Sequence, residues 1–119
     1  MAPARRSEPR GDLAGRPASP METRQTDEFS RWLKGLRDNR ASARIAARIV
    51  RIEAGNLGEV RSLGGGASEC KIDYGPGYRL YFTIRRQRLI VLLAGGDKRS
   101  QRRDVALARE LAAALDTGK

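Results

Sequence analysis

The fold is decided by residues 74–101, YGPGYRLYFTIRRQRLIVLLAGGDKRSQ. Apolar and polar side chains alternate from Arg79 to Ile84, which is the period of a β-strand. Leu89–Ala94 is apolar at every position, as expected of a central strand that is covered on both faces. Arg86-Gln87 between them predicts a turn. Glycines before and after these runs predict a tight turn, a hairpin and a Gly-rich exit.

Residues 69–73 also alternate, which predicts one more strand before the tight turn. Burial decides the register of such strands, because a slip of one residue would bury the charged side chains. The apolar pairs that this rule aligns are Ile72–Leu80, Cys70–Phe82, Phe82–Val91 and Leu80–Leu93. The polar pairs on the other face are Asp73–Arg79 and Lys71–Tyr81. We expect this second face, which carries Arg79, to be uncovered.

Helical periodicity predicts three helices around these strands. Thr26-Asp27-Glu28 supplies an N-cap and an acidic first turn for a helix over about 27–38. A second helix covers about 41–54 and ends at Gly55 as its C′ residue, and a third begins near residue 100. The second helix carries a stripe of arginines, at Arg40, Arg44, Arg48 and Arg51. Such a stripe is either a solvated face or a contact for nucleic acid or an acidic partner.

These elements predict a single α+β domain over residues 21–119. We expect an N-terminal helical hairpin, packed on a small twisted antiparallel sheet of three or four strands, and a C-terminal helix. A strand at Glu22–Gln25 would add an edge. Residues 1–20 are rich in Pro, Arg, Ala and Gly without periodic apolar positions, which predicts a disordered basic tail. The alternative for this tail is a basic arm that touches nucleic acid.

The composition points to an anionic partner and limits the chemistry. The chain has 24 Lys and Arg against 14 Asp and Glu, a net charge of +10, no histidine and one cysteine. The excess of positive charge is typical of proteins that bind polyanions. Without histidine there is no imidazole proton shuttle, and the lone Cys70 leaves no Cys/His zinc cluster, so we expect no metal site. No apolar run approaches the ~20 residues that span a bilayer.

A series of short sequence motifs occurs along the chain. Each motif alone is a weak indicator of a family, but their order and spacing together are specific. They are Phe29/Trp32-Leu33, Leu36-Arg37-Asp38, Ala43-Arg44-Ile45, Gly55-Asn56, Tyr74-Gly75-Pro76-Gly77-Tyr78-Arg79, and Leu92-Leu93-Ala94-Gly95-Gly96-Asp97-Lys98 followed by Gln101 and Asp104. In these motifs, over about residues 22–115, the chain resembles the HigB-like addiction-module killer proteins. These belong to the RelE/ParE superfamily of toxins from bacterial type II toxin–antitoxin modules.

The resemblance implies a RelE/ParE-like fold and a metal-independent endoribonuclease that cleaves messenger RNA without a cofactor. The implied partners are a cognate antitoxin of helix-turn-helix type, messenger RNA and the ribosome. No membrane is involved, and the implied location is the bacterial cytoplasm.

The resemblance also assigns roles to residues. The implied catalytic residues are Arg79, Lys98 and Lys71. The planar fork of Arg79 would hold two oxygens of the phosphorane, and the two lysines would bind phosphate or move a proton. Tyr81 would bind RNA by stacking on a base. The other candidate RNA-binding residues are Arg44 and Arg48 of the arginine stripe, and Arg99 and Arg102.

Two other functions also fit the sequence. A ParE-like member of the superfamily would inhibit DNA gyrase without catalysis, and a non-catalytic basic RNA- or DNA-binding module would also explain the charge. Fold cannot decide between activities that share one fold. The feature that discriminates is whether Lys71, Arg79, Tyr81 and Lys98 converge on one concave patch. The simpler interpretations are a structural Asp73–Arg79 ion pair and a plain strand-to-helix turn at residues 95–98.

Overall fold

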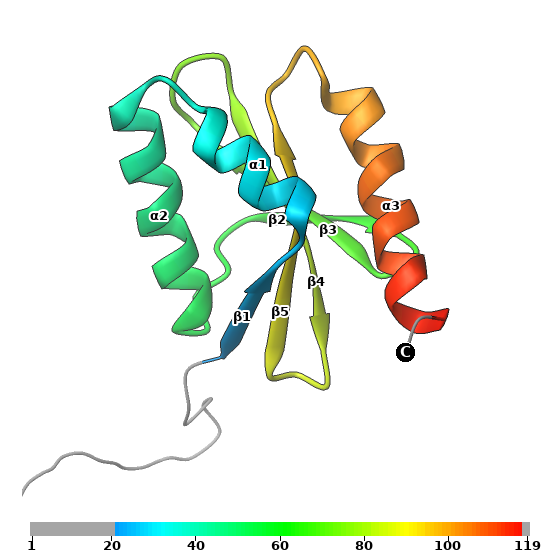
Figure 1. Ribbon diagram of the computed structural model, residues 1–119. Coiled ribbons are helices and arrows are strands. Elements are labelled where there is room, and N and C mark those ends of the chain that lie inside the picture. The colour runs from blue at the N-terminus through cyan, green and yellow to red at the C-terminus, as the bar shows by residue number, and fades with distance from the viewer. Residues whose placement is uncertain (1–20, 118–119) are drawn as a thin grey trace, which may run out of the picture.

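The computed structural model describes residues 21–117, with side chains as far as residue 115. The elements along the chain are β1 (Glu22–Gln25), α1 (Asp27–Gly35), α2 (Asn39–Glu53), β2 (Val60–Gly64), β3 (Ala67–Ile72), β4 (Tyr78–Arg85), β5 (Leu89–Gly96) and α3 (Gln101–Thr117). The five strands form one sheet in the order β1-β5-β4-β3-β2 (Figure 1). The prediction of a disordered tail over residues 1–20 lies outside the described residues.

The predicted fold class is wrong. The sheet has five strands instead of three or four, and it is mixed instead of antiparallel, because β1 pairs parallel to β5. The two N-terminal helices do not form a hairpin unit that packs as one body. Instead α1 packs mainly on β5, and α2 packs on β3. Figure 1 shows α2 and α3 flanking the sheet while α1 crosses in front of it. The optional edge strand at Glu22–Gln25 is confirmed as β1.

Side-chain caps fix where the first two helices begin. Thr26 caps α1, as predicted: its Oγ1 accepts a hydrogen bond from the Phe29 N–H at 3.0 Å. The same hydroxyl donates to the Leu93 carbonyl at 2.6 Å and so ties the helix start to β5. Asp38 caps α2 by accepting from the N–H groups of Arg40 and Ala41. Because a capping aspartate marks a helix start, α2 begins earlier than the sequence predicts.

Strand β5 is the centre of the core. It lies between β1 and β4, and its side chains enter two clusters on the two faces of the sheet, which confirms the prediction of a doubly covered strand. Phe29, Ile45 and Ile52 of α1 and α2 pack with Ile90 and Leu92 on one face. On the other face, α3 side chains pack with those of the strands. The buried members of this second cluster are Ala67, Tyr81, Val91, Leu93, Ala94, Ala108 and Ala112.

The register between β3 and β4 differs from the prediction by two residues. Cys70 lies opposite Leu80, and Lys71 lies opposite Arg79. A shift of two residues leaves every side chain on its predicted face, so the burial pattern could not detect it. The tight turn decides the register, because the N–H of Gly77 donates to the Tyr74 carbonyl. The predicted pairs Phe82–Val91 and Leu80–Leu93 between β4 and β5 are also wrong. Phe82 lies opposite Leu92, because the hairpin turn sets a register shifted by one residue, and a bulge between Tyr81 and Phe82 adds a second shift that places Leu80 opposite Gly95.

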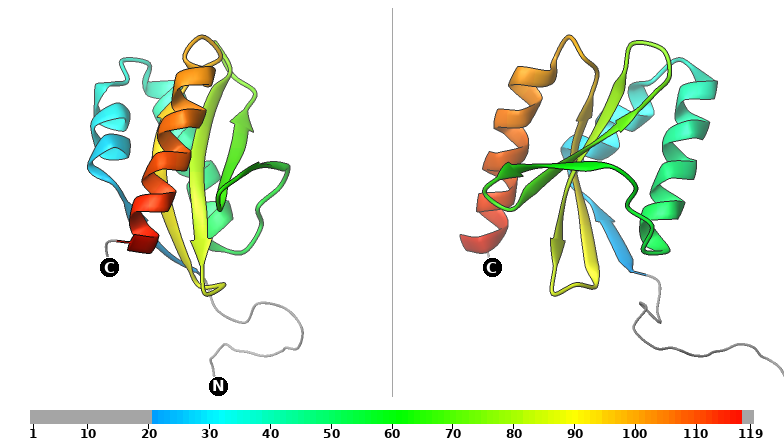
Figure 2. Two further views of the ribbon diagram at one scale, coloured as in Figure 1. Left: turned by 90° about the vertical axis from the view of Figure 1, so that its right-hand side faces the viewer. Right: turned by 180° about the vertical axis from the view of Figure 1, so that it is seen from behind.

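Two loops lie side by side at one end of the molecule. They are residues 73–77, between β3 and β4, and residues 97–100, between β5 and α3 (Figure 2). The Lys98 N–H donates to the Pro76 carbonyl at 3.4 Å, which joins them. None of the helices within residues 21–117 combines the length and the apolar character needed to cross a membrane.

Candidate functional site

The two joined loops border an open pocket of about 420 Å³. The residues that line it are Lys71, Asp73, Tyr74, Gly75, Pro76, Gly77, Arg79 and Lys98. We call this hollow the cationic pocket, since Lys71, Arg79 and Lys98 bring three positive charges to it against the single carboxylate of Asp73. These are the three residues that the resemblance names as catalytic. Lys71 and Lys98 are exposed at its rim.

Glycine allows the turn to approach Arg79 closely. Gly75 and Gly77 have φ values of 57° and 80°, which favour glycine. The Gly77 carbonyl accepts a hydrogen bond from Arg79 Nη1 at 2.8 Å. A Cβ on Gly77 would lie 3.4 Å from the same nitrogen. The glycine therefore lets the backbone orient the guanidinium.

Arg79 is buried, which corrects the expectation of an uncovered face. Its residue is only 8% exposed, because α3 covers this side of the sheet. Its Nε lies 3.5 Å from Oε2 of Glu69, whereas Asp73 pairs with Lys71 at 3.4 Å. The predicted Asp73–Arg79 pair is therefore wrong. Arg79 is held from behind by a carboxylate and from the side by a carbonyl, and its guanidinium reaches the wall of the cationic pocket.

Glu69 joins three elements behind the pocket, and the sequence analysis missed it. It is 7% exposed, and its carboxylate contacts Arg79 on β4, Arg61 on β2 at 3.1 Å, and Gln101 of α3 at 2.9 Å. A buried carboxylate with such partners is stabilised by charge-assisted hydrogen bonds. The sequence indicates this role only by placing an acidic residue in a strand whose neighbours carry arginines. The pairing of Glu69 with Arg79 can be predicted only from the correct strand register.

Tyr81 does not line the cationic pocket. It is fully buried in the cluster beneath α3. The resemblance implies that its ring stacks on a base, but a buried ring is not available for this role. Its hydroxyl forms no hydrogen bond of normal geometry within the described residues, although the Glu69 carboxylate lies close to it. Burial, and then the charge of the nearby Glu69 carboxylate, raise the pKa of Tyr81 well above its ordinary value. Tyr81 therefore belongs to the core.

Close packing explains the two glycines before Lys98. A Cβ on Gly95 would collide with the ring of Trp32, and a Cβ on Gly96 would collide with the carboxylate of Asp104. Both glycines lie in β5 and not in a loop, so they serve the packing of α1 and α3 on the strand. The strand-to-helix turn follows, where Asp97 accepts hydrogen bonds from the next N–H groups. That turn carries Lys98 to the pocket.

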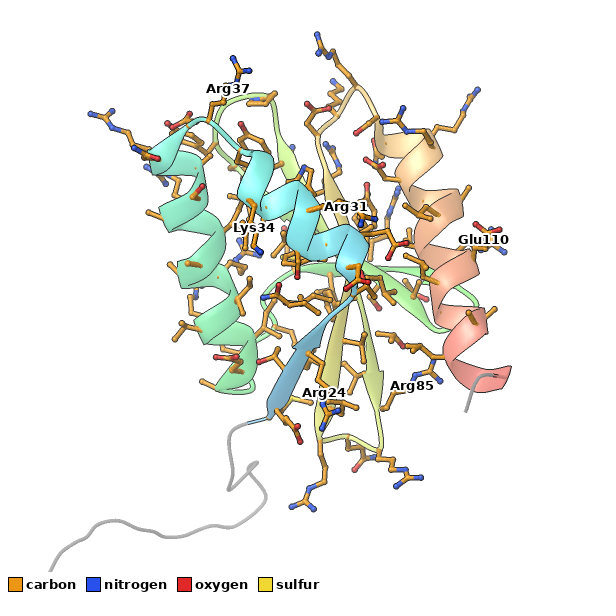
Figure 3. All side chains as sticks on the ribbon, in the orientation of Figure 1. Arg24, Arg31, Lys34, Arg37, Arg85 and Glu110 are labelled. Carbon is orange, nitrogen blue, oxygen red and sulfur yellow. The ribbon has the colours of Figure 1, made fainter. Side chains whose placement is uncertain are left out.

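The other predicted RNA-binding residues lie outside the cationic pocket. Arg99 and Arg102 are exposed near the start of α3. Arg44 and Arg48 lie on α2 and line a second hollow of about 280 Å³ together with Ala47, Arg51, Ile72 and Asp73. We call this hollow the arginine groove. Figure 3 shows basic side chains spread over the molecule, such as Arg31 and Lys34 on α1 and Arg37 on the loop that follows it. A hollow lined by several of them is therefore more informative than the charge alone.

The described residues offer no ready metal site: within residues 21–117 no three or more His, Cys, Asp or Glu side chains gather in a way that could hold a metal ion. What the cationic pocket offers instead is three cations on a rigid frame. Such an arrangement binds phosphate oxygens and stabilises the charge that develops on them.

The fold and the pocket together define a small basic protein with a cationic pocket at its strand ends. No protein-family model matches the chain. Over 95 residues it is 41% identical to an uncharacterized protein of Haemophilus influenzae, and the match covers 80% of this chain and 96% of that protein. The chain therefore belongs to the same family as this Haemophilus protein.

Proposed function

We propose that this protein is the toxin of a bacterial type II toxin–antitoxin pair and that it cleaves messenger RNA at the cationic pocket. The observation that carries the proposal is that Lys71, Arg79 and Lys98 line one pocket. Two segments in which the sequence resembles HigB-like toxins contribute to its lining: residues 74–79 supply Arg79 and the tight turn, and residues 92–98 supply Lys98. The proposal rests on these segments and their chemistry, not on the predicted arrangement of helices and strands.

The chemistry is an attack by the ribose 2′-oxygen on the adjacent phosphorus. The new P–O2′ bond forms as the P–O5′ bond breaks, which leaves a 2′,3′-cyclic phosphate and a 5′-hydroxyl. Arg79 holds two phosphate oxygens and offsets the charge of the phosphorane. Asp73 accepts the 2′ proton, and Lys98 donates a proton to the departing 5′-oxygen. Each preorganised cation contributes roughly 10²–10³ in rate in such sites.

The antitoxin is the proposed regulator. An acidic segment that covers the cationic pocket would silence the protein by occupying the place of the phosphate. Such a complex should weaken as salt rises, because screening acts on exposed charges. The proposed location is the bacterial cytoplasm, where messenger RNA and the ribosome are found.

The test is to express the chain in bacteria, alone and with Lys98→Gln, and to map messenger RNA ends while measuring plasmid supercoiling. We expect growth arrest with new RNA 5′ ends carrying a hydroxyl, and loss of both with Lys98→Gln. Relaxed or damaged DNA with intact messenger RNA would refute the ribonuclease and indicate a gyrase inhibitor. Growth arrest with intact messenger RNA and normal supercoiling would indicate a protein that binds its target without catalysis.

A further inference from the structure

The arginine groove adjoins the cationic pocket. Asp73 lines both hollows, and its neighbour Tyr74 lines the pocket. Arg44 of the groove lies over the Tyr74 ring, with its guanidinium carbon 4.7 Å from the ring centre. A ligand that leaves the pocket past Asp73 and Tyr74 therefore enters the groove directly.

The charges of the groove are not neutralised by the fold. Arg44, Arg48 and Arg51 are three or four positions apart on α2, so they are neighbours on one helix face and repel one another by a few tenths of a kcal/mol. None of them forms an ion pair with a carboxylate within residues 21–115. The acid that lines the groove, Asp73, pairs with Lys71. The fold thus gathers three like charges and, within the described residues, pairs none of them with a carboxylate, which leaves them for an anionic ligand.

Two of the three arginines are held in place by contacts that leave their charge intact. Arg48 Nη1 donates to the Sγ of buried Cys70 at 2.8 Å. Arg44 stacks on Tyr74, whose hydroxyl donates to the Asp38 carboxylate at 3.1 Å. Ordering these long side chains in advance lowers the entropy cost of binding. The groove is thus a prepared surface, unlike a row of freely moving surface arginines.

We propose that the arginine groove binds the phosphate backbone of the same RNA strand, beyond the phosphodiester that the cationic pocket holds. The inference rests on the proposed function of that pocket. A continuous polyanion suits two adjoining cationic hollows, because each nucleotide carries one negative charge along the strand. The substrate is therefore single-stranded RNA several nucleotides long, and a dinucleotide reaches the pocket only.

The test compares a dinucleotide with an octanucleotide, both as fluorescent 2′-O-methyl RNA. The methyl group blocks the attacking oxygen, so binding is measured by anisotropy without cleavage. The groove variant is Arg44→Gln with Arg51→Gln, because both side chains are exposed. Arg48 stays unchanged because it contacts buried Cys70. The matched control is Arg88→Gln with Arg109→Gln, which removes the same charge from exposed positions outside the groove.

We expect the wild-type protein to bind the octanucleotide at least tenfold more tightly than the dinucleotide, and the groove variant to lose most of this gain. For single strands, each phosphate contact contributes about 0.7 to the slope of log affinity against log salt. The slope should therefore fall by roughly 1.4 in the groove variant. Affinity for the dinucleotide should not change. Arg51→Gln alone should give about half of the slope change.

Equal losses in the groove variant and in the control would overturn the proposal, since they would indicate charge attraction without a site. An octanucleotide bound no more tightly than the dinucleotide would overturn it as well. Cleavage of ordinary RNA is measured beside binding and separates the two ideas. A wild-type protein with a length-dependent groove but no cleavage would refute the ribonuclease and retain the groove. If the wild-type protein and the groove variant cleave RNA of every length equally well, the groove is refuted and the ribonuclease is retained.

Discussion

Replacing Glu69 with glutamine tests whether a carboxylate behind the cationic pocket holds Arg79 in place. The two side chains are 7% and 10% exposed, and Glu69 Oε2 lies 3.5 Å from Arg79 Nε. Removing the negative charge leaves the guanidinium in a buried place without its carboxylate. It also places an amide N–H₂ group among donors from Arg61, Arg79 and Gln101.

The cost follows from the burial of both partners. Breaking a buried ion pair by removing one partner costs about 3–5 kcal/mol. We expect about 3 kcal/mol, because glutamine retains one oxygen as an acceptor and Arg61 on the far side faces solvent. A domain of this size loses about 4–8 °C of melting temperature per kcal/mol. Glu69→Gln should therefore melt roughly 12–24 °C below the wild-type protein.

The assay is thermal unfolding followed by circular dichroism, with Glu59→Gln as the control. Glu59 is exposed, so the same charge change there should stay within about 0.5 kcal/mol. A double-mutant cycle adds Arg79→Gln, and the double variant should be more stable than the sum of the single losses by about 1–3 kcal/mol. Equal melting temperatures for Glu69→Gln and Glu59→Gln would refute the reasoning. Additive losses in the cycle would show that the two side chains do not support each other.

Three further predictions concern packing, protonation and catalysis. Gly96→Ala should destabilise the folded protein by about 1–3 kcal/mol, because its Cβ would collide with a carboxylate on α3. Gly35→Ala, which has open space around it, is the control and should leave the midpoint of urea unfolding unchanged or higher. Tyr81→Phe should be as stable as the wild-type protein or more stable at pH 7, since its buried hydroxyl forms no hydrogen bond of normal geometry within the described residues. The raised pKa of folded Tyr81 means that the unfolded chain loses this proton first, so wild-type stability should fall above about pH 10 and that of Tyr81→Phe should fall less. Lys98→Gln should slow RNA cleavage at least a hundredfold with an unchanged melting temperature, because Lys98 is exposed, and Arg88→Gln should affect neither quantity.

Local signals in the sequence predicted local structure well. The Thr26 cap, the C′ glycine at residue 55 and the turn at Arg86-Gln87 are all present. Each depends on a few neighbouring residues, whose hydrogen bonds and backbone angles are set by their own chemistry. The apolar run of β5 also predicted its central position, because a strand that is apolar on both faces needs cover on both.

Pairings between distant segments were beyond the sequence signal. β1 joins β5 in parallel across more than sixty residues, and four residues of mixed character give no sign of their partner. The error of two residues between β3 and β4 has a similar origin, since the strand period repeats every two residues and burial alone accepts both registers. Glu69 was missed as a direct consequence, because its partner Arg79 was assigned to Asp73.

The position of Arg79 changes how the catalytic proposal must be tested. The sequence placed it on an uncovered face, where substitution by alanine would affect function and spare stability. In the structure α3 covers that face, and Arg79 is the buried partner of Glu69. Arg79→Ala would therefore remove the buried cation beside Glu69 and leave that carboxylate only exposed Arg61 and the amide of Gln101. Growth in the presence of this variant would then reflect an unfolded protein as well as an inactive one. Lys98 reaches the same pocket from an exposed turn, so its substitution tests catalysis without disturbing the fold. Arg79→Lys is informative only when the melting temperature of the variant is measured beside its activity.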